Sequence, residues 1–191
     1  EKGYGVGVLD CCALRLSDPE ILEIIKDKKP RIVGLSSTTY ALPSSITLAN
    51  TIRKELPDQL TMLGGSHANV AGEETINEYD AFDLVAVGPD GEYTALEIIE
   101  TYKASGYSRS SLLGRSDLLS SIDGIYYSVN GQTVGTRPRS TITDLDQLPL
   151  PARDLFPMER YVPLPNQYKK LPLTNMLVIR GCPYVCTFCD Q

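Results

Sequence analysis

Short apolar runs alternate with helix-like stretches over roughly the first half of the chain, and this order limits the folds it can adopt. The apolar runs have the length of strands, and the stretches between them repeat apolar residues every three or four positions. The expected strands are 6–9, 31–35, 60–63 and 84–87, and the expected helices are 19–28, 44–55, 73–79 and 92–104. Near-continuous apolar strands joined by helices are typical of a parallel sheet covered on both faces. With right-handed crossovers, the sequence predicts an open, doubly wound α/β fold.

Small and polar residues follow each expected strand, at the carboxyl ends where such sheets bind ligands. They are Asp10, Cys11 and Cys12 after the first strand, Ser36, Ser37, Thr38 and Thr39 after the second, Gly64, Gly65, Ser66 and His67 after the third, and Gly88, Pro89, Asp90, Gly91 and Glu92 after the fourth. These residues let a ligand approach the backbone and offer hydrogen-bond donors. Ordinary turns between strands and helices prefer the same residue types. Composition alone therefore leaves a ligand-binding rim and simple turn chemistry as equal alternatives.

Three of the five cysteines, Cys182, Cys186 and Cys189, lie within the last ten residues. Their Cys-x3-Cys-x2-Cys spacing can bind three irons of a four-iron cluster and leave the fourth open, whereas a ferredoxin-type site closes its cluster with four cysteines. A structural zinc site needs a fourth ligand, and the single histidine, His67, is far away in sequence. An odd number of cysteines and no recognisable signal peptide disfavour a disulfide framework. The motif favours an open iron–sulfur cluster, with zinc as the alternative.

The charge balance and hydropathy exclude several classes of partner. The chain has 191 residues, with 18 basic and 24 acidic side chains and a net charge of −6. Such a balance provides no electrostatic footprint for nucleic acid or for an anionic membrane surface. No apolar run has the length that spans a bilayer. We therefore expect a cytoplasmic protein with no nucleic-acid partner and no membrane partner.

The second half of the chain is less regular. A short helix is expected over 116–121, and an Asn-Gly pair at 130–131 predicts a type I′ hairpin over 124–136. A proline-rich connector follows over 137–151. An apolar strand over 175–180 would deliver Cys182 from its carboxyl end, where the catalytic residues of (β/α) barrels lie.

Two of these features resemble parts of one known family. The cysteine motif, with Phe188 just before its last cysteine, resembles the signature of the radical S-adenosylmethionine (radical SAM) enzymes. The α/β order before it, with the turns at 36–38, 64–67 and 90–92, resembles the cobalamin-binding domain of the B12-dependent radical SAM enzymes. The resemblance covers nearly the whole chain. It implies a flavodoxin-like (Rossmann-type) cobalamin-binding domain over 1–110, a linker with the hairpin over 111–170, and the start of a radical SAM barrel over 171–191.

The resemblance also implies a set of cofactors and ligands. Cys182, Cys186 and Cys189 would hold a [4Fe-4S] cluster, whose open iron chelates S-adenosylmethionine beside Phe188. Cobalamin would be bound by Asp10, Cys12, Ser36, Ser37, Thr38, Gly64, Gly65, Ser66, His67, Gly91 and Glu92. The parent enzyme would cleave S-adenosylmethionine reductively and drive radical methyl transfer, or a related rearrangement or cyclisation. Its small-molecule substrate would bind in a C-terminal domain outside this chain, and flavodoxin or ferredoxin would donate the electron.

Relatives place one strand and helix before the position of Glu1, with that strand in the middle of the sheet. The resemblance therefore implies a fragment that is inactive alone. The cobalamin motif Asp-x-His-x-x-Gly is also altered, because Cys12 stands in place of the histidine and Arg15 in place of the glycine. We expect cobalamin to bind without a histidine ligand to cobalt at this position, and Cys12 to be a small buried side chain. A function of another class remains open, namely a non-catalytic flavodoxin-like module that binds cobalamin or a nucleotide.

Overall fold

The computed structural model describes residues 3–171, 173, 174, 176, 180–182, 184 and 186–188. The chain divides into two compact units. One consists of Glu1–Asp27 with Thr143–Arg180, and the other of Lys28–Ile142 with Gly181–Gln191. Among the described residues, no helix combines the length and the apolar character needed to cross a bilayer.

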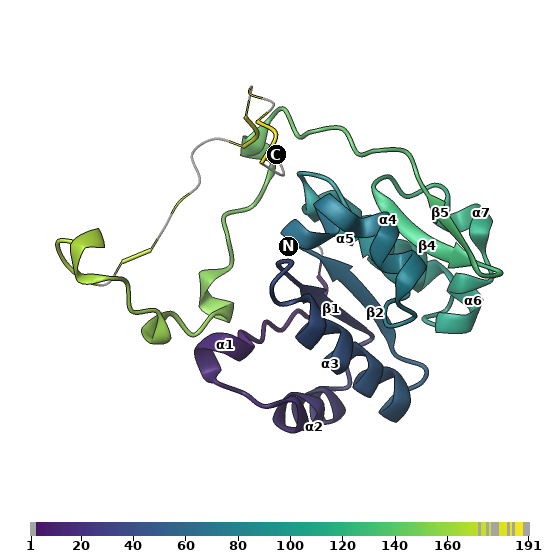
Figure 1. Ribbon diagram of the computed structural model, residues 1–191, viewed down its shortest axis with the longest axis horizontal. Helices are drawn as coiled ribbons and strands as arrows, with labels where there is room; N and C mark the ends of the chain where they lie inside the picture. Colours follow the sequence, from purple (N-terminus) through teal and green to yellow (C-terminus); the bar gives the residue numbers. More distant parts are fainter. Residues whose placement is uncertain are drawn as a thin grey trace. The chain divides into compact units, whose positions relative to one another are not determined.

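The second unit contains a five-stranded mixed sheet in the order β1-β2-β3-β4-β5 (Figure 1). The strands are β1 (Ile32–Ser36), β2 (Leu60–Gly64), β3 (Leu84–Ala86), β4 (Ile125–Val129) and β5 (Gln132–Gly135). β1, β2 and β3 are parallel, with Ile32 opposite Leu60 and Met62 opposite Leu84. β4 runs antiparallel to β3, and β5 antiparallel to β4. The predicted parallel sheet is thus confirmed for three strands and is extended by an antiparallel pair.

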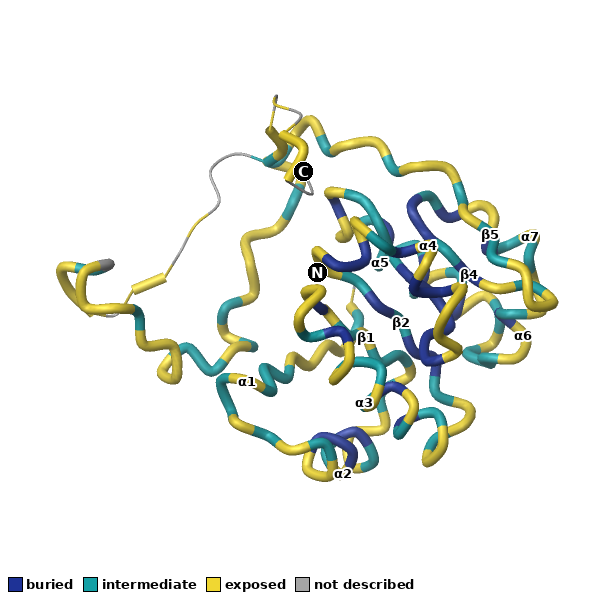
Figure 2. Tube along the Cα trace, viewed as in Figure 1, coloured by how far each residue is buried: buried dark blue, intermediate teal, exposed yellow. Residues whose placement is uncertain are grey.

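Helices cover both faces of this sheet. They are α3 (Leu42–Glu55), α4 (Ser66–Glu78), α5 (Gly91–Ala104), α6 (Arg109–Leu113) and α7 (Ser116–Leu119). Adjacent strand residues point to opposite faces, and accordingly Leu84 and Val85 belong to different hydrophobic clusters. Leu84 packs with residues of α5, α6 and α7, whereas Val85 packs with residues of α3 and α4. These buried positions appear as the dark segments in Figure 2.

Two expected elements differ from the structure. Residues 6–9 are not a strand, because none of the described strands pairs with them, and Val6 and Val8 are exposed. The helix expected from Glu73 begins at Ser66 instead, with a kink at Ala71 (φ −138°, ψ 35°). Gly65 precedes α4 and Gly72 follows its first turn. These glycines and the kink interrupt the apolar periodicity from which a helix is predicted.

The hairpin has the predicted turn, since Asn130 (φ 52°) and Gly131 (φ 76°) both have positive φ. It pairs with β3 through β4, from Leu84 opposite Tyr127 to Ala86 opposite Ile125. The hairpin is therefore part of the same sheet as the parallel strands.

In the other unit the ordered elements are short. They are α1 (Cys11–Leu14), α2 (Asp18–Lys28) and the 3-10 helices η1 (Leu145–Gln147), η2 (Arg153–Leu155), η3 (Met158–Arg160) and η4 (Pro165–Gln167). The last residue of α2, Lys28, falls just beyond the border of this unit. α2 confirms the expected helix at 19–28. Its start is stabilised by the carboxylate of Glu20, which accepts hydrogen bonds from the amide (2.8 Å) and hydroxyl (2.6 Å) of Ser17. Most of the strand expected at 175–180 lies outside the described residues.

Candidate functional site

Three loops follow β1, β2 and β3 and lie at one edge of the sheet, since parallel strands end on the same side. We call residues 36–41, 64–70 and 88–92 the rim. The structure describes all of these residues. It contains the sequence-predicted residues Ser36, Ser37, Thr38, Gly64, Gly65, Ser66, His67, Gly91 and Glu92, and the structure brings them to the same edge of the sheet.

The first two rim loops are joined by backbone hydrogen bonds. The Ser37 amide donates to the Gly64 carbonyl (3.0 Å), and the His67 amide donates to the Ser37 carbonyl (3.0 Å). Gly65 has a φ of +92°, and a Cβ at this position would lie 2.8 Å from the Ser37 nitrogen and oxygen and from the Ser36 Oγ. Only glycine therefore permits this close approach of the two loops.

His67 braces the same loops from within the protein. The sequence suggested a polar loop residue, but His67 lies in the first turn of α4 and is 5% exposed. Its Nε2 lies 2.9 Å from the Thr75 Oγ1, which donates its own proton to the Ala71 carbonyl (2.6 Å). Nε2 therefore donates to Thr75, and Nδ1 lies 3.1 Å from the Thr39 hydroxyl. Both ring nitrogens are thus engaged inside the protein.

The third loop is tied to the second and to a later part of the chain. The Gly88 amide donates to the Asn69 Oδ1 at 2.9 Å. Asp90 is 1% exposed, and its Oδ2 accepts a hydrogen bond of 2.6 Å from the Ile142 amide. Nothing in the local sequence marks Asn69 or Ile142 as members of the rim network, because their partners lie 19 and 52 residues away.

The exposed surface of the rim is polar and carries little charge. Ser36, Thr38, Gly65 and Ser66 are exposed, and Glu92 is the one charged residue exposed there. The rim sequence contains neither Lys nor Arg. Two large exposed side chains that the sequence did not single out are Tyr40, 97% exposed, and Val70, 63% exposed. Because α4 begins in the rim with no side-chain cap, its positive dipole end contributes weak anion attraction there, whereas Asp90 and Glu92 offset that of α5.

Asp10 and Cys12 lie in the other unit. Asp10 uses both carboxylate oxygens within the protein: Oδ1 accepts from the Ala13 amide (2.9 Å) and Oδ2 from the Tyr161 hydroxyl (2.7 Å). These bonds, that of Ala13 first, lower the pKa of Asp10, and the bond to Asp10 raises the pKa of Tyr161 to about 12. Sequence reasoning missed Tyr161, because 151 residues separate it from Asp10.

The two neighbouring thiols differ from each other. Cys12 is exposed, so the expectation of a buried side chain is wrong; it lies on the one-turn helix α1, which buries none of its residues. Cys11 is half-buried, and its Sγ is 3.6 Å from the Leu9 carbonyl. Burial raises the pKa of the Cys11 thiol, and the adjacent Cys12 adds to the effect.

The cysteine motif is only partly described. Cys182 and Cys186 are exposed free thiols, Phe188 is 90% exposed, and Cys189 lies outside the described residues. In the part of the chain that is described, no three His, Cys, Asp or Glu side chains form a metal-binding group. Exposed, unpaired thiols have the donor chemistry that an iron–sulfur cluster requires.

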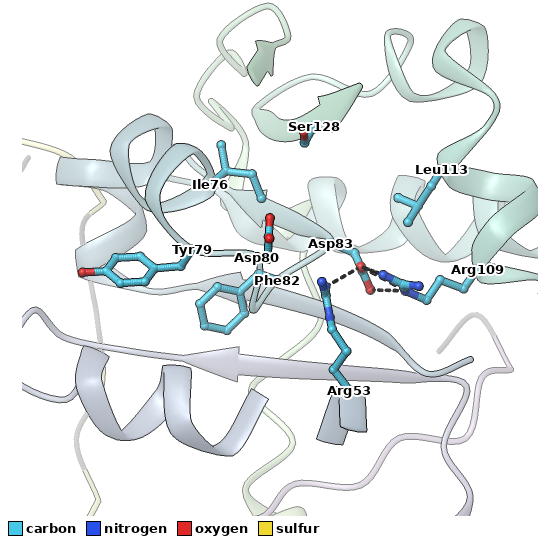
Figure 3. A pocket seen from close by; sticks show the side chains of 9 residues that line it. All are labelled: Arg53, Ile76, Tyr79, Asp80, Phe82, Asp83, Arg109, Leu113 and Ser128. Carbon is cyan, nitrogen blue, oxygen red and sulfur yellow. Dashed lines mark hydrogen bonds and ion pairs between the residues drawn. The ribbon is translucent and has the colours of Figure 1, made fainter. Parts of the chain in front are cut away.

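A charged cluster lies at the amino end of β3, away from the rim, and has a structural role (Figure 3). Asp83, just before β3, accepts hydrogen bonds from Arg53 (2.8 Å), Arg109 (2.6 Å) and the amide of Thr61 (2.9 Å). The adjoining cavity, of about 120 Å³, is smaller than ordinary cofactor sites. The buried carboxylate is fully paired, as stability requires.

Comparisons with known proteins place these features in a family. A family model described as the B12 binding domain matches residues 1–99. An uncharacterized methyltransferase of Pyrococcus horikoshii is 30% identical over 98% of this chain and 37% of its own length. The anaerobic magnesium-protoporphyrin IX monomethyl ester cyclase of Rubrivivax gelatinosus is 27% identical, over 96% of this chain and 31% of its own. The hopanoid C-3 methylase of Methylococcus capsulatus is 26% identical, over 91% and 30%.

This chain spans about a third of the length of these curated relatives. The family match covers more than half of its residues and includes all three rim loops. The protein therefore belongs to the B12-binding domain family.

Proposed function

We propose that this chain is the cobalamin-binding part of a radical SAM enzyme that carries out methyl transfer or a related cyclisation. The observation that carries the proposal is the presence, in one chain, of a B12-binding domain and the Cys182, Cys186 and Cys189 motif. The names of the relatives, two methyl-transferring enzymes and a cyclase, support an enzyme of this kind. A small-molecule substrate, an electron donor such as flavodoxin or ferredoxin, and a reducing cytoplasmic setting complete the proposal.

The rim has the chemistry that cobalamin needs. Cobalamin presents uncharged carboxamides around its ring and a single phosphodiester on its nucleotide tail. Serine and threonine hydroxyls and glycine backbone at the rim offer partners for the carboxamides, and the start of α4 favours the phosphodiester. The rim has no basic side chain to neutralise the greater negative charge of a nucleoside di- or triphosphate. This contrast favours cobalamin over a nucleotide.

Cobalt would be bound without a protein imidazole. His67 is the only histidine of the chain, and both of its ring nitrogens are engaged by Thr39 and Thr75 inside the protein. Cys12 occupies the position at which the histidine-bearing motif would supply its ligand. The rim side chains would therefore hold cobalamin without ligating its cobalt. When bound, the cluster would supply the electron that cleaves S-adenosylmethionine, and cobalamin the one-carbon chemistry.

The cobalamin proposal is tested on the full-length protein under argon. After incubation with hydroxocobalamin and gel filtration, we expect about one cobalamin per chain in the visible spectrum. After reduction to cob(II)alamin, the electron paramagnetic resonance (EPR) spectrum should be identical in protein labelled with 15N-histidine and in unlabelled protein. A label-dependent change in nitrogen splitting would show an imidazole ligand and refute the proposed geometry. Failure to retain cobalamin would refute binding itself.

The cluster proposal is tested separately, by reconstitution with iron and sulfide. We expect a brown chromophore near four irons per chain, because the motif is typical of a [4Fe-4S] cluster. Cys186→Ala should lose most of this absorbance, whereas the matched control Cys11→Ala should retain it. If the chromophore survived Cys186→Ala, or if zinc were the only metal taken up, the radical SAM assignment would be wrong. Cobalamin binding without a cluster would instead indicate a non-catalytic binding module.

A further inference from the structure

The segment that follows β5 is attached to the α/β unit rather than leaving it at once. We call residues 137–142 the strap; Figure 1 shows it in green, where the chain leaves the hairpin. At its start, the Gly124 amide donates to the Arg137 carbonyl at 2.8 Å, which prolongs the pairing of β4 with β5. The sequence had suggested only a proline-rich connector from this point. The strap therefore has structural partners that its composition does not indicate.

Arg139 is the main anchor of the strap. Its side chain is only 9% exposed, which is unusual for an arginine. Nε donates to the Thr94 Oγ1 (2.6 Å), and Nη2 donates to the Asp123 carbonyl (3.1 Å) and to the Glu97 carboxylate. Thr94 and Glu97 lie one turn apart on α5, so a single buried guanidinium holds the strap against that helix.

The end of the strap reaches the rim. The Ile142 amide donates to the Oδ2 of Asp90, a buried residue in the loop between β3 and α5. Asp90 directly precedes Gly91 and Glu92, which belong to the proposed cobalamin site. The chain thus leaves this unit beside the rim, although β5 ends at Gly135.

A buried arginine is a costly way to hold six residues of connector, because its guanidinium loses hydration while its partner Glu97 remains 44% exposed. The sheet does not require it, since β4 and β5 are already paired through their backbones. Without the anchor, residues 138–142 would join the connector, while Thr136 and Arg137 would stay bonded to Ile125 and Gly124 through their backbones. Each of these residues would extend the reach of the exit point by up to about 3.3 Å.

We propose that Arg139 is a positioning residue, which fixes the start of the connector at the rim and thereby limits how far the cluster-bearing segment can move from the bound cofactor. This inference rests on the proposed function. The nearby Arg137 provides a matched contrast, because its side chain is 81% exposed and pairs with Asp123, at 3.0 Å, on the surface. Exposed pairs of this kind contribute little. We therefore expect Arg137→Leu to leave the quantities measured in the following tests at their wild-type values.

The first test measures the relation between the two cofactors in the full-length protein loaded with cobalamin and cluster. A reduced cluster speeds the relaxation of a nearby cob(II)alamin spin, and this effect falls steeply with distance. We expect Arg139→Leu to lower the relaxation enhancement in EPR power saturation at least twofold, at unchanged cofactor content. Arg137→Leu should match the wild type. Equal enhancement in Arg139→Leu and wild type would overturn the proposal.

The second test needs no cofactor and so separates this inference from the proposed function. In hydrogen exchange of the cofactor-free full-length chain, peptides covering 138–146 should exchange at least tenfold faster in Arg139→Leu than in wild type, with no change in β2. Glu97→Gln, a milder variant that keeps the guanidinium, should give a smaller increase. Unchanged exchange in both variants would refute the anchor even if cobalamin binding were proven. If the wild type bound no cobalamin but the strap exchanged as expected, the proposed function would fail and the anchoring would stand.

Discussion

Two single residues of the rim, Gly65 and His67, hold its loops together. Gly65 brings two loops into backbone contact, and His67 joins Thr39 of one loop to Thr75 of α4. Neither residue presents a charge to a ligand. Their effect is to hold the exposed hydroxyls and amides of the rim in place before a ligand arrives, which lowers the entropy cost of binding.

A pair of neighbouring glycines tests this account. Gly65→Ala would place a methyl group 2.8 Å from the Ser37 backbone at a φ of +92°, whereas a Cβ at Gly64 meets nothing within 4 Å. We expect Gly65→Ala to lower the free energy of unfolding by about 1–3 kcal/mol. Gly64→Ala should change it by less than about 0.5 kcal/mol. Urea denaturation followed by circular dichroism measures both, and equal midpoints would contradict the close approach of the loops.

The hydrogen bond between Tyr161 and Asp10 predicts a dependence on pH. The pKa of Tyr161 is raised to about 12 and that of Asp10 is lowered. The raised pKa means that the phenol's contribution to stability is complete below its ordinary pKa of about 10 and is lost as the pH rises through 12. The lowered pKa of Asp10 means that the carboxylate's contribution to stability is complete above its ordinary pKa of about 3.9. This contribution is lost as the pH falls through the lower pKa that Asp10 has in the folded protein.

Absorbance of tyrosinate at 295 nm follows this titration. We expect one tyrosine of the wild type to ionise near pH 12, and the same residue in Asp10→Asn to ionise nearer to pH 10, because the carboxylate partner is gone. Tyr161→Phe should reduce the number of late-ionising tyrosines by one and leave that of Tyr102, whose pKa is raised by burial. An unchanged number of late-ionising tyrosines in Asp10→Asn would contradict the contact.

At the scale of elements, β1 is an unprotected edge strand of the sheet. Among the strands that the structure describes, β1 pairs with β2 alone, and its sequence Ile-Val-Gly-Leu-Ser has no charge and no proline. Ile32, Val33 and Leu35 are only half-buried, although a strand that is apolar on both faces is typical of a sheet interior. An uncharged, unpaired edge is a template for pairing with another chain.

A charge on this edge should reduce such pairing. Gly34 is exposed in β1, and a Cβ there would touch only the side chain of Met62, at 3.6 Å or more. We expect the 191-residue chain to self-associate as its concentration rises, and Gly34→Lys to shift this association to at least tenfold higher concentration in light scattering. The control is Ser128→Lys, on β4, a strand that is paired on both sides. Equal association of Gly34→Lys and wild type would show that the edge is not the contact.

For the molecule as a whole, sequence patterns were sufficient for local structure. The alternation of apolar runs and helical periodicity predicted β1, β2, β3, α2, α3 and α5, and Asn130-Gly131 predicted the hairpin, because these signals act within a few residues. The motifs at the strand ends also identified most of the rim. Residues 6–9 failed as a strand, since strand formation depends on a partner that a local pattern does not reveal.

The contacts that assemble the rim and the strap could not be inferred in the same way. Asn69 with Gly88, Asp90 with Ile142, and Arg139 with α5 join residues 19 to 52 positions apart. Hydrogen bonds between distant residues leave no periodic trace in a sequence, because they depend on where the folded backbone brings each donor and acceptor. Local motifs thus suggested the kind of ligand only through their resemblance to a known family, and folding alone brought the rim loops and the exit of the connector to one edge of the sheet.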